Sequence, residues 1–288
     1  MHVSEPVRLA QHRLSDGRNL AWAEWGPQRG IPVLLCPGAA TSRRLGFGTD
    51  AVDALGIRLI SVDRPGLGAS DPSPGRTLSS FAEDIAELRR AVLGSGQLAV
   101  VGYSAGGPFA LACAAAGVAE RTAVVAGADE FASFDNGLPD DLRSIVELAA
   151  ADPAAAEQSF AEFGSADSLW QLITRFSPEG DLAVYRSPGF EPIFRKAMAE
   201  GFAQGPGGYA RDTLLTMSRW PFAVADVRTP VDLWYGQLDT SPSHSPDHGA
   251  ALAGRIPSAN HHLVADAGGS LLWTHAEAIL RELTRSDR

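Results

Sequence analysis

Lysine is nearly absent from this sequence: among 288 residues it occurs once, as Lys196. Acidic residues outnumber basic ones by 34 to 24, which gives a formal net charge of −10 at pH 7. Nucleic-acid phosphates and anionic membrane surfaces are bound by clustered Lys and Arg side chains. The sequence therefore predicts neither nucleic acid nor membrane as a partner, and the expected partner is a small-molecule substrate.

Cysteine and long apolar runs are also scarce. The two cysteines, Cys36 and Cys113, are too few for a disulfide framework in a chain of this length, which favours a reducing cytoplasm. No segment approaches roughly 18 consecutive apolar residues, the length of a membrane helix, and residues 1–6 lack the apolar region of a signal peptide. These absences predict a soluble, cytoplasmic protein whose cysteines are inert core thiols.

Short apolar runs recur along the chain, each followed by Gly, Pro or Asp, and they are typical of strands that are covered on both faces. They comprise residues 33–36, 58–62, 98–101, 122–126, 231–235 and 262–265. Residues 7–14 and 20–25 flank a turn and predict an N-terminal hairpin. Apolar residues at helical spacing lie between the runs, as in residues 78–92 and 271–283. This alternation predicts an α/β protein with a mainly parallel sheet.

The alternation of strand-like and helical segments stops between residues 131 and 221, where strand-like runs are missing and the spacing of apolar residues is helical. We interpret this stretch as a helical cap, or lid, inserted into an α/β core made of residues 1–130 and 222–288. Its aromatic side chains either line an apolar pocket or form the core of the cap itself. They are Phe131, Phe134, Phe160, Phe163, Trp170, Phe176, Phe194, Phe202, Tyr209 and Trp220. The segment 205–208, Gly-Pro-Gly-Gly, is interpreted as a hinge or as a loop between helices.

The most informative segment is 102–106, a Gly-x-Ser-x-Gly pattern between a predicted strand and a predicted helix. This is the context that a nucleophile elbow requires. A strained turn would push the Ser104 hydroxyl out above the sheet, and side chains at Gly102 or Gly106 would collide with neighbouring backbone. The helix N-terminus behind Ser104 favours a developing negative charge. The alternative is a small-residue turn with an incidental serine.

At this point the chain resembles the α/β-hydrolase fold superfamily, most closely the bacterial serine hydrolases with a helical cap between the sixth and seventh strands of an eight-stranded sheet. Three further segments carry the resemblance. Residues 36–40 lie where the family has its oxyanion loop, with Pro37 in place of the family's His. Residues 63–70 resemble its Asp-x-x-Gly-x-Gly-x-Ser turn, and residues 234–239 resemble the Gly-x-x-Asp ending of the seventh strand.

The resemblance implies a role for several residues. Ser104 would be the nucleophile and Asp239 the acid of the triad, and the main-chain N–H groups of Ala39 and Ala105 would form the oxyanion hole. Asp129, just after the sixth strand, is the alternative acid, because some relatives place theirs there. For Asp239 the other interpretation is a carboxylate that caps its loop.

The family's catalytic histidine is missing, because its expected position falls near Gly268 or Gly269. A serine hydroxyl is a weak nucleophile without a base. The topology places most histidines away from Ser104: His2, His12, His261, His262 and His275. His244 and His248 follow the seventh strand on the correct rim. We hypothesise that His244 is a relocated base; the alternative is that it packs the loop, and a metal pair with His248 is not expected because Pro246 interrupts the helix that would align them.

These observations predict a serine hydrolase that cleaves an ester, lactone or related acyl bond of a small, largely apolar substrate. Two alternatives remain open: a non-hydrolytic enzyme of the same fold (a lyase, cyclase or decarboxylase), or a catalytically silent small-molecule binder. No cofactor and no metal are expected, since the segment 102–106 lacks the Gly-x-Gly-x-x-Gly spacing of a dinucleotide loop. Substrate identity and oligomeric state are left open.

Overall fold

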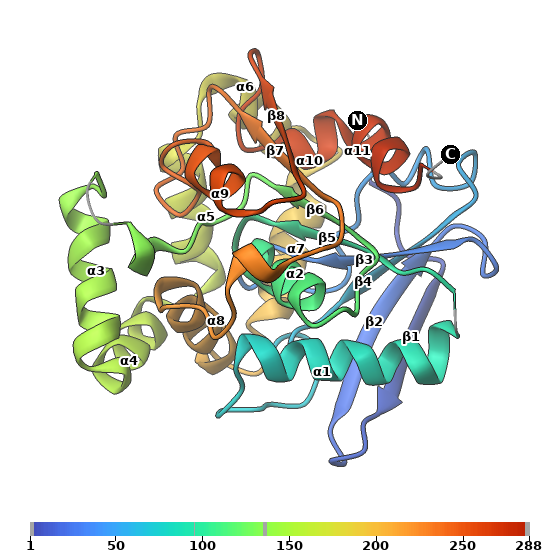
Figure 1. The fold of residues 1–288 in the computed structure, drawn as a ribbon, viewed down its shortest axis with the longest axis horizontal. Helices are drawn as coiled ribbons and strands as arrows, with labels where there is room; N and C mark the ends of the chain where they lie inside the picture. Colours follow the sequence, from blue (N-terminus) through green and yellow to red (C-terminus); the bar gives the residue numbers. More distant parts are fainter. Residues whose placement is uncertain (1–2, 95, 135–136, 286–288) are drawn as a thin grey trace.

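The computed structural model describes residues 3–94, 96–134 and 137–285. Within them, eight strands form one sheet in the order β1-β2-β4-β3-β5-β6-β7-β8 (Figure 1). The strands are β1 (Arg8–Arg13), β2 (Asn19–Trp25), β3 (Ile31–Cys36), β4 (Ile57–Val62), β5 (Ala99–Tyr103), β6 (Arg121–Val125), β7 (Val231–Gly236) and β8 (Ala259–Val264). β2 pairs antiparallel with β1 and β4, and every other pairing is parallel. The predicted hairpin and mainly parallel sheet are confirmed.

The last strand begins earlier than expected. The apolar run predicts its start at residue 262, but β8 starts at Ala259 and pairs along its whole length with β7, so that His261 and His262 lie inside the strand. β8 is an edge strand with exposed side chains along it, and such a strand accepts polar residues that an interior strand would not. The predicted start of the last strand is therefore three residues too late.

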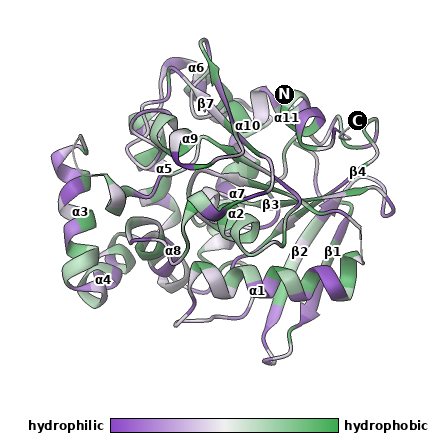
Figure 2. Ribbon diagram, viewed as in Figure 1, coloured by the Kyte–Doolittle hydropathy of each residue, from purple (hydrophilic) through white to green (hydrophobic). Residues whose placement is uncertain are grey.

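Two layers of helices cover the sheet. α1 (Leu78–Leu88), α2 (Gly107–Ala115) and α9 (Ala250–Arg255) pack against one face, while α10 (Leu271–Thr274) and α11 (Ala276–Leu283) pack against the other. Along α1 both apolar and polar residues occur (Figure 2). The buried positions recur mostly every three or four residues, as a helix with one covered face requires. The predicted single last helix is interrupted at His275, which separates α10 from α11.

The described residues of the insert between β6 and β7 form six α-helices and two short 3₁₀ helices, and they contain no strand. The α-helices are α3 (Asp140–Ala151), α4 (Pro153–Phe163), α5 (Ala166–Phe176), α6 (Glu179–Tyr185), α7 (Glu191–Gly201) and α8 (Gly207–Met217), of which α3 and α4 lie at the left in Figure 1. The helical insertion between the sixth and seventh strands is confirmed, whereas its assignment to residues 131–221 as a separate cap stays a prediction. Gly207 and Gly208, expected in a loop, form the first turn of α8.

Both cysteines are buried in the core and free, as the sequence predicts. Cys36 ends β3 and Cys113 lies in α2. Burial raises the pKa of the Cys36 thiol to about 12, which keeps it protonated and unreactive. Among the described helices, none combines the length and the apolar composition that crossing a bilayer requires.

Candidate active site

Ser104 occupies a strained turn between β5 and α2. The strand ends at Tyr103, and a short 3₁₀ helix, Ser104–Gly106, leads directly into α2. Ser104 has a φ of 51°, in the left-handed region that a residue with a side chain seldom adopts. Its side chain lines the cavity described below, so the turn presents the hydroxyl to that cavity.

The two glycines of the pattern are required by close contacts. A Cβ at Gly102 would lie 2.5 Å from the carbonyl oxygen of Gly106. A Cβ at Gly106 would lie 2.0 Å from the carbonyl oxygen of Cys36, on the neighbouring strand β3. Both distances are far shorter than van der Waals contact, so only glycine lets α2 start this close to β3. This is the collision on which the interpretation of the pattern depends.

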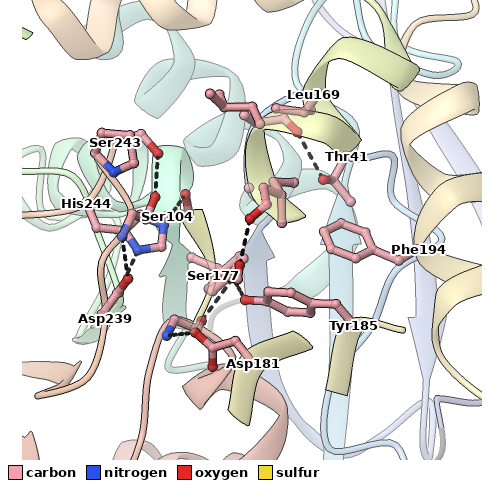
Figure 3. Close-up of a pocket in the computed structure, with 18 residues that line it drawn as sticks. Thr41, Ser104, Leu169, Ser177, Asp181, Tyr185, Phe194, Asp239, Ser243 and His244 are labelled. Atoms are coloured by element: carbon pink, nitrogen blue, oxygen red, sulfur yellow. Dashed lines mark hydrogen bonds and ion pairs between the residues drawn. The ribbon is translucent and has the colours of Figure 1, made fainter. Parts of the chain in front are cut away.

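The structure brings Ser104, Asp239 and His244 into hydrogen-bond contact (Figure 3). His244 Nε2 lies 2.9 Å from Ser104 Oγ, and its Nδ1 lies 2.6 Å from Asp239 Oδ2. An ionised carboxylate can only accept a hydrogen bond, so Nδ1 carries the imidazole proton and the Nε2 lone pair accepts from the Ser104 hydroxyl. The three side chains therefore stand in the order that a nucleophile, a base and an orienting acid require.

The loop that follows β7 carries both His244 and Asp239. Within it, the Ser241 N–H donates to Asp239 Oδ1 at 3.0 Å, and the His244 N–H donates to the Ser241 carbonyl at 3.2 Å. The Ser245 N–H donates to the carbonyl of Gly127, which follows β6, at 2.9 Å. These bonds fold the five residues after Asp239 back over the ends of the parallel strands, where the imidazole meets Ser104.

The side chain of Asp239 is buried, and burial alone would raise the pKa of its carboxyl. The opposing effects prevail: the charge and hydrogen bond of His244, together with the Ser241 N–H, hold the pKa of Asp239 below its usual value. Asp239 is therefore ionised at neutral pH and able to stabilise a positive charge on the imidazole.

Gly269 faces the same imidazole from the loop after β8. A Cβ at residue 269 would lie 3.2 Å from His244 Cε1 and 3.3 Å from Asp239 Oδ1. Of the two positions near which the resemblance places the family's histidine, Gly268 and Gly269, the second thus directly adjoins the imidazole that His244 supplies from the β7 loop. No sequence motif marks His244 as the substitute for the family's histidine, and only elimination among the histidines points to it.

The other histidines are engaged elsewhere. His12 lies 3.8 Å from Glu87, His275 contacts Thr274, and His261 contacts the main-chain carbonyl of His248. His262 stacks on Trp234 and contacts Asp232. In the described part of the chain, His244 is the one histidine that lines the cavity at Ser104. His2 lies outside the described residues.

Asp129, the alternative acid, does not contact His244. It is fully buried, and its carboxyl accepts from the Glu130 N–H at 2.6 Å and lies 3.5 Å from the Ser245 hydroxyl. Burial raises the pKa of Asp129 to about 6, despite the opposing Glu130 N–H and the nearby Arg255. The carboxylate that meets the imidazole is that of Asp239.

The predicted oxyanion residues flank Ser104. Ala105 follows it at the start of the helix, and Ala39 lies in the loop after β3 and lines the cavity. Within the described residues no acceptor satisfies the Ala39 N–H. Helix N-termini and unsatisfied N–H groups attract negative charge.

A cavity of about 60 Å³ opens at Ser104. Apolar side chains come from α5 and α7: Leu169, Leu172, Ile173 and Phe194. Besides the three hydrogen-bonded side chains, polar side chains come from α6 and the segment before it (Ser177, Asp181 and Tyr185), from the loop after β3 (Thr41) and from the loop after β7 (Ser241 and Ser243). Of the ten aromatic residues singled out in the sequence, all of them described, only Phe194 lines the cavity. Tyr185 was missed, because nothing in the pattern separates a pocket aromatic from a packing one.

Asp181 and Tyr185 connect α6 to the loop behind His244. The Asp181 carboxylate accepts the N–H groups of Gly269 and Ser270 at 2.7 and 3.0 Å. Tyr103, next to Ser104, donates to the Gly269 carbonyl at 3.0 Å, so the Tyr185 hydroxyl, 3.1 Å away, donates to Tyr103. Sequence reasoning singled out neither α6 residue, since they lie far along the chain from the residues they hold.

The comparisons with known proteins identify the family. Residues 31–276 match the family model described as alpha/beta hydrolase fold. This chain belongs to the alpha/beta hydrolase fold family. The predicted resemblance and fold class are thereby confirmed.

The individual proteins that this chain is similar to match either over part of its length or at low sequence identity. A non-heme chloroperoxidase from Streptomyces lividans is 36% identical over an alignment of 101 residues, and the match covers 32% of this chain and 34% of that protein. The chain thus matches about a third of the length of this curated relative. An enol-lactonase from Burkholderia xenovorans LB400 superposes with a TM-score of 0.68 at 20% identity, over 95% of this chain and 97% of that one. A thermophilic esterase from Thermogutta terrifontis has a TM-score of 0.68 at 22% identity, over 96% and 97%.

Proposed function

We propose that this protein is a serine hydrolase that cleaves an ester, lactone or related acyl bond of a small, largely apolar substrate. The observation that carries the proposal is the hydrogen-bonded series from Ser104 through His244 to Asp239 at the edge of a cavity. Acyl transfer requires a serine hydroxyl that is activated by an oriented imidazole, whereas binding alone does not. The series therefore supports acyl transfer.

In the proposed reaction, Ser104 Oγ attacks the carbonyl carbon of the substrate while His244 Nε2 takes the hydroxyl proton. Asp239 stabilises the resulting imidazolium. The carbonyl oxygen becomes an oxyanion, which accepts hydrogen bonds from the N–H groups of Ala39 and Ala105. As the tetrahedral intermediate collapses, the bond to the leaving alkoxide breaks and His244 returns the proton to it.

Release of the alcohol leaves an acyl-enzyme on Ser104. A water molecule then attacks the acyl carbon, and His244 takes one of its protons. Collapse of the second intermediate transfers that proton to Ser104 Oγ and frees the carboxylic acid. For a lactone, the alcohol and the acid remain parts of one molecule, and ring opening is the net reaction.

The cavity supports a small acyl group. Its volume is about 60 Å³, and Leu169, Leu172 and Phe194 cover one side of it. No Lys or Arg is among its lining residues, so an anionic acyl group would lack a counter-ion there. Short, uncharged acyl chains fit both the size and the polarity.

Labelling with a fluorophosphonate probe, together with hydrolysis of p-nitrophenyl esters from acetate to decanoate, tests the proposal. We expect labelling of the wild-type protein that disappears in Ser104→Ala, and faster hydrolysis of the short esters. Ser144→Ala removes an exposed serine of α3 and is the matched control, with labelling as in wild type. If the wild-type protein is neither labelled nor active on any of these esters, the proposed function is wrong.

A further inference from the structure

Arg64 is fully buried beside the candidate oxyanion loop. A buried guanidinium is costly unless all its donors are satisfied. It donates through Nη1 to the Pro37 carbonyl at 2.5 Å, through Nη2 to the Gly38 carbonyl at 3.0 Å, and through Nε to Asp212 Oδ2 at 2.7 Å. Its guanidinium also lies over the ring of Phe109 in α2, 4.8 Å from the centroid. One side chain thus donates hydrogen bonds to two successive carbonyl groups of the loop.

The second of these carbonyls controls the direction of the Ala39 N–H. The Gly38 C=O and the Ala39 N–H belong to one planar trans peptide group, so they point in opposite directions. When Arg64 fixes the carbonyl on one side, the N–H is fixed on the other, where Ala39 lines the cavity. A Cβ at Gly38 would lie 3.7 Å from Ser104 Cβ, so this peptide directly adjoins the elbow.

We propose that Arg64 is the positioning residue of the oxyanion hole, an inference that rests on the proposed hydrolase function. It orients the Gly38–Ala39 peptide and, by donating to its carbonyl, polarises the N–H into a stronger donor. A preorganised donor needs no reorientation when negative charge develops on the substrate, which is the condition under which such donors contribute most. Arg64 itself touches neither substrate nor Ser104 in this scheme.

The insert supplies the anchor for this arginine. Asp212 of α8, also buried, accepts from Arg64 through one oxygen and from Arg76 through the other. Arg76 further donates to the Gly208 carbonyl at 2.8 Å, also in α8, and bonds no carbonyl of residues 37–39. The two arginines therefore share one carboxylate, but only Arg64 reaches the loop.

Because Arg64 and Arg76 both pair with Asp212, substitutions of the two arginines form a matched pair of variants. Arg64→Met and Arg76→Met each remove one buried guanidinium and each leave Asp212 paired with the other arginine. Both should therefore fold and lose thermal stability to a comparable extent, as measured by Tm. The informative readouts are kcat and KM for p-nitrophenyl butyrate, and the inhibition constant of a trifluoromethyl ketone, which forms a tetrahedral oxyanion adduct with an active serine.

For Arg64→Met we expect kcat to fall about 10²-fold with KM nearly unchanged, because loss of one oxyanion donor costs about 10²–10³ in kcat. The trifluoromethyl ketone should bind more weakly by a similar factor. Arg76→Met should keep kcat and the inhibition constant within about threefold of wild type. Arg64→Lys, which keeps the charge but not the two-pronged geometry, should give an intermediate kcat.

Equal losses of kcat in Arg64→Met and Arg76→Met would overturn the inference and leave Arg64 a purely structural residue. If Arg64→Met does not fold, Arg64→Lys decides: a reduced kcat at constant KM supports positioning, and a wild-type kcat overturns it. A wild-type protein without esterase activity or labelling overturns the proposed function and this inference together. An active wild type whose Arg64 variants match the Arg76 variant overturns this inference alone.

Discussion

The α-carbon of Gly269 faces the imidazole of His244, so closely that a Cβ on residue 269 would lie 3.2 Å from His244 Cε1. Two loops thus converge on one space: the β8 loop, where the family carries its histidine, and the β7 loop, where this chain carries His244. Only one imidazole fits there. Glycine at 269 makes room for the ring that enters from the other side.

This relationship predicts that the base can be moved back. His244→Ala should lower kcat by about 10⁴-fold or more, in line with the loss of a histidine base in serine hydrolases. Adding Gly269→His to this variant should raise kcat at least tenfold, because the new ring starts beside the vacated space. Steady-state hydrolysis of p-nitrophenyl butyrate measures both changes. His275→Ala, which alters a histidine outside the cavity, is the control, and a double variant no faster than His244→Ala would contradict the prediction.

The two candidate acids are distinguished by their contacts. Asp239→Asn should lower kcat by about 10³- to 10⁴-fold, because an amide cannot stabilise the imidazolium and favours the wrong tautomer. Asp129→Asn should leave kcat within about threefold, since Asp129 bonds Glu130 and Ser245 instead of the imidazole. The same ester assay separates them. Comparable losses in the two variants would mean that both carboxyls support the base.

Asp129 should also make stability depend on pH. Its pKa is raised by burial from 3.8 to about 6, so between these values the folded protein binds more protons than the unfolded chain. The stability linked to its proton is therefore fully present below about pH 3.8 and is lost as pH rises through about 6, by about 3 kcal/mol in total. Asp129→Asn removes this titration. Urea unfolding from pH 4 to pH 8 should show the variant gaining stability relative to wild type as pH rises, and a constant difference would refute this.

Phe194 should limit the length of the acyl chain. It lines the cavity from α7 and is nearly fully buried there. Phe194→Ala removes a ring from the wall, so the preferred p-nitrophenyl ester should lengthen by two or more carbon atoms. The expected loss of stability is about 3–5 kcal/mol, the usual cost of a buried Phe→Ala change, so activity is compared at a temperature where the variant is folded. Phe163→Ala, which alters a half-exposed ring outside the cavity, should leave the preference unchanged.

Local sequence was enough to predict the elbow and most of the sheet. A strand, a Gly-x-Ser-x-Gly turn and a helix are consecutive in the chain, and the strained φ of Ser104 follows from that order. The central strands are covered on both faces, which leaves an apolar run in the sequence. β8 lies at the sheet edge, so its apolar run covers only the second half of the strand, and its start was accordingly misplaced.

The sequence by itself determined the strand–turn–helix that carries Ser104, the buried strands and the candidate status of Asp239 and His244, since each depends on neighbouring residues. Tertiary structure decided where the imidazole lies, because its place depends on contacts of the β7 loop with Gly127 and Gly269. It also decided that Asp181 holds the loop behind His244 and that Arg64 donates to the carbonyl of the Gly38–Ala39 peptide. These partners lie tens of residues apart or more, and no local pattern in a single sequence encodes contacts over such separations.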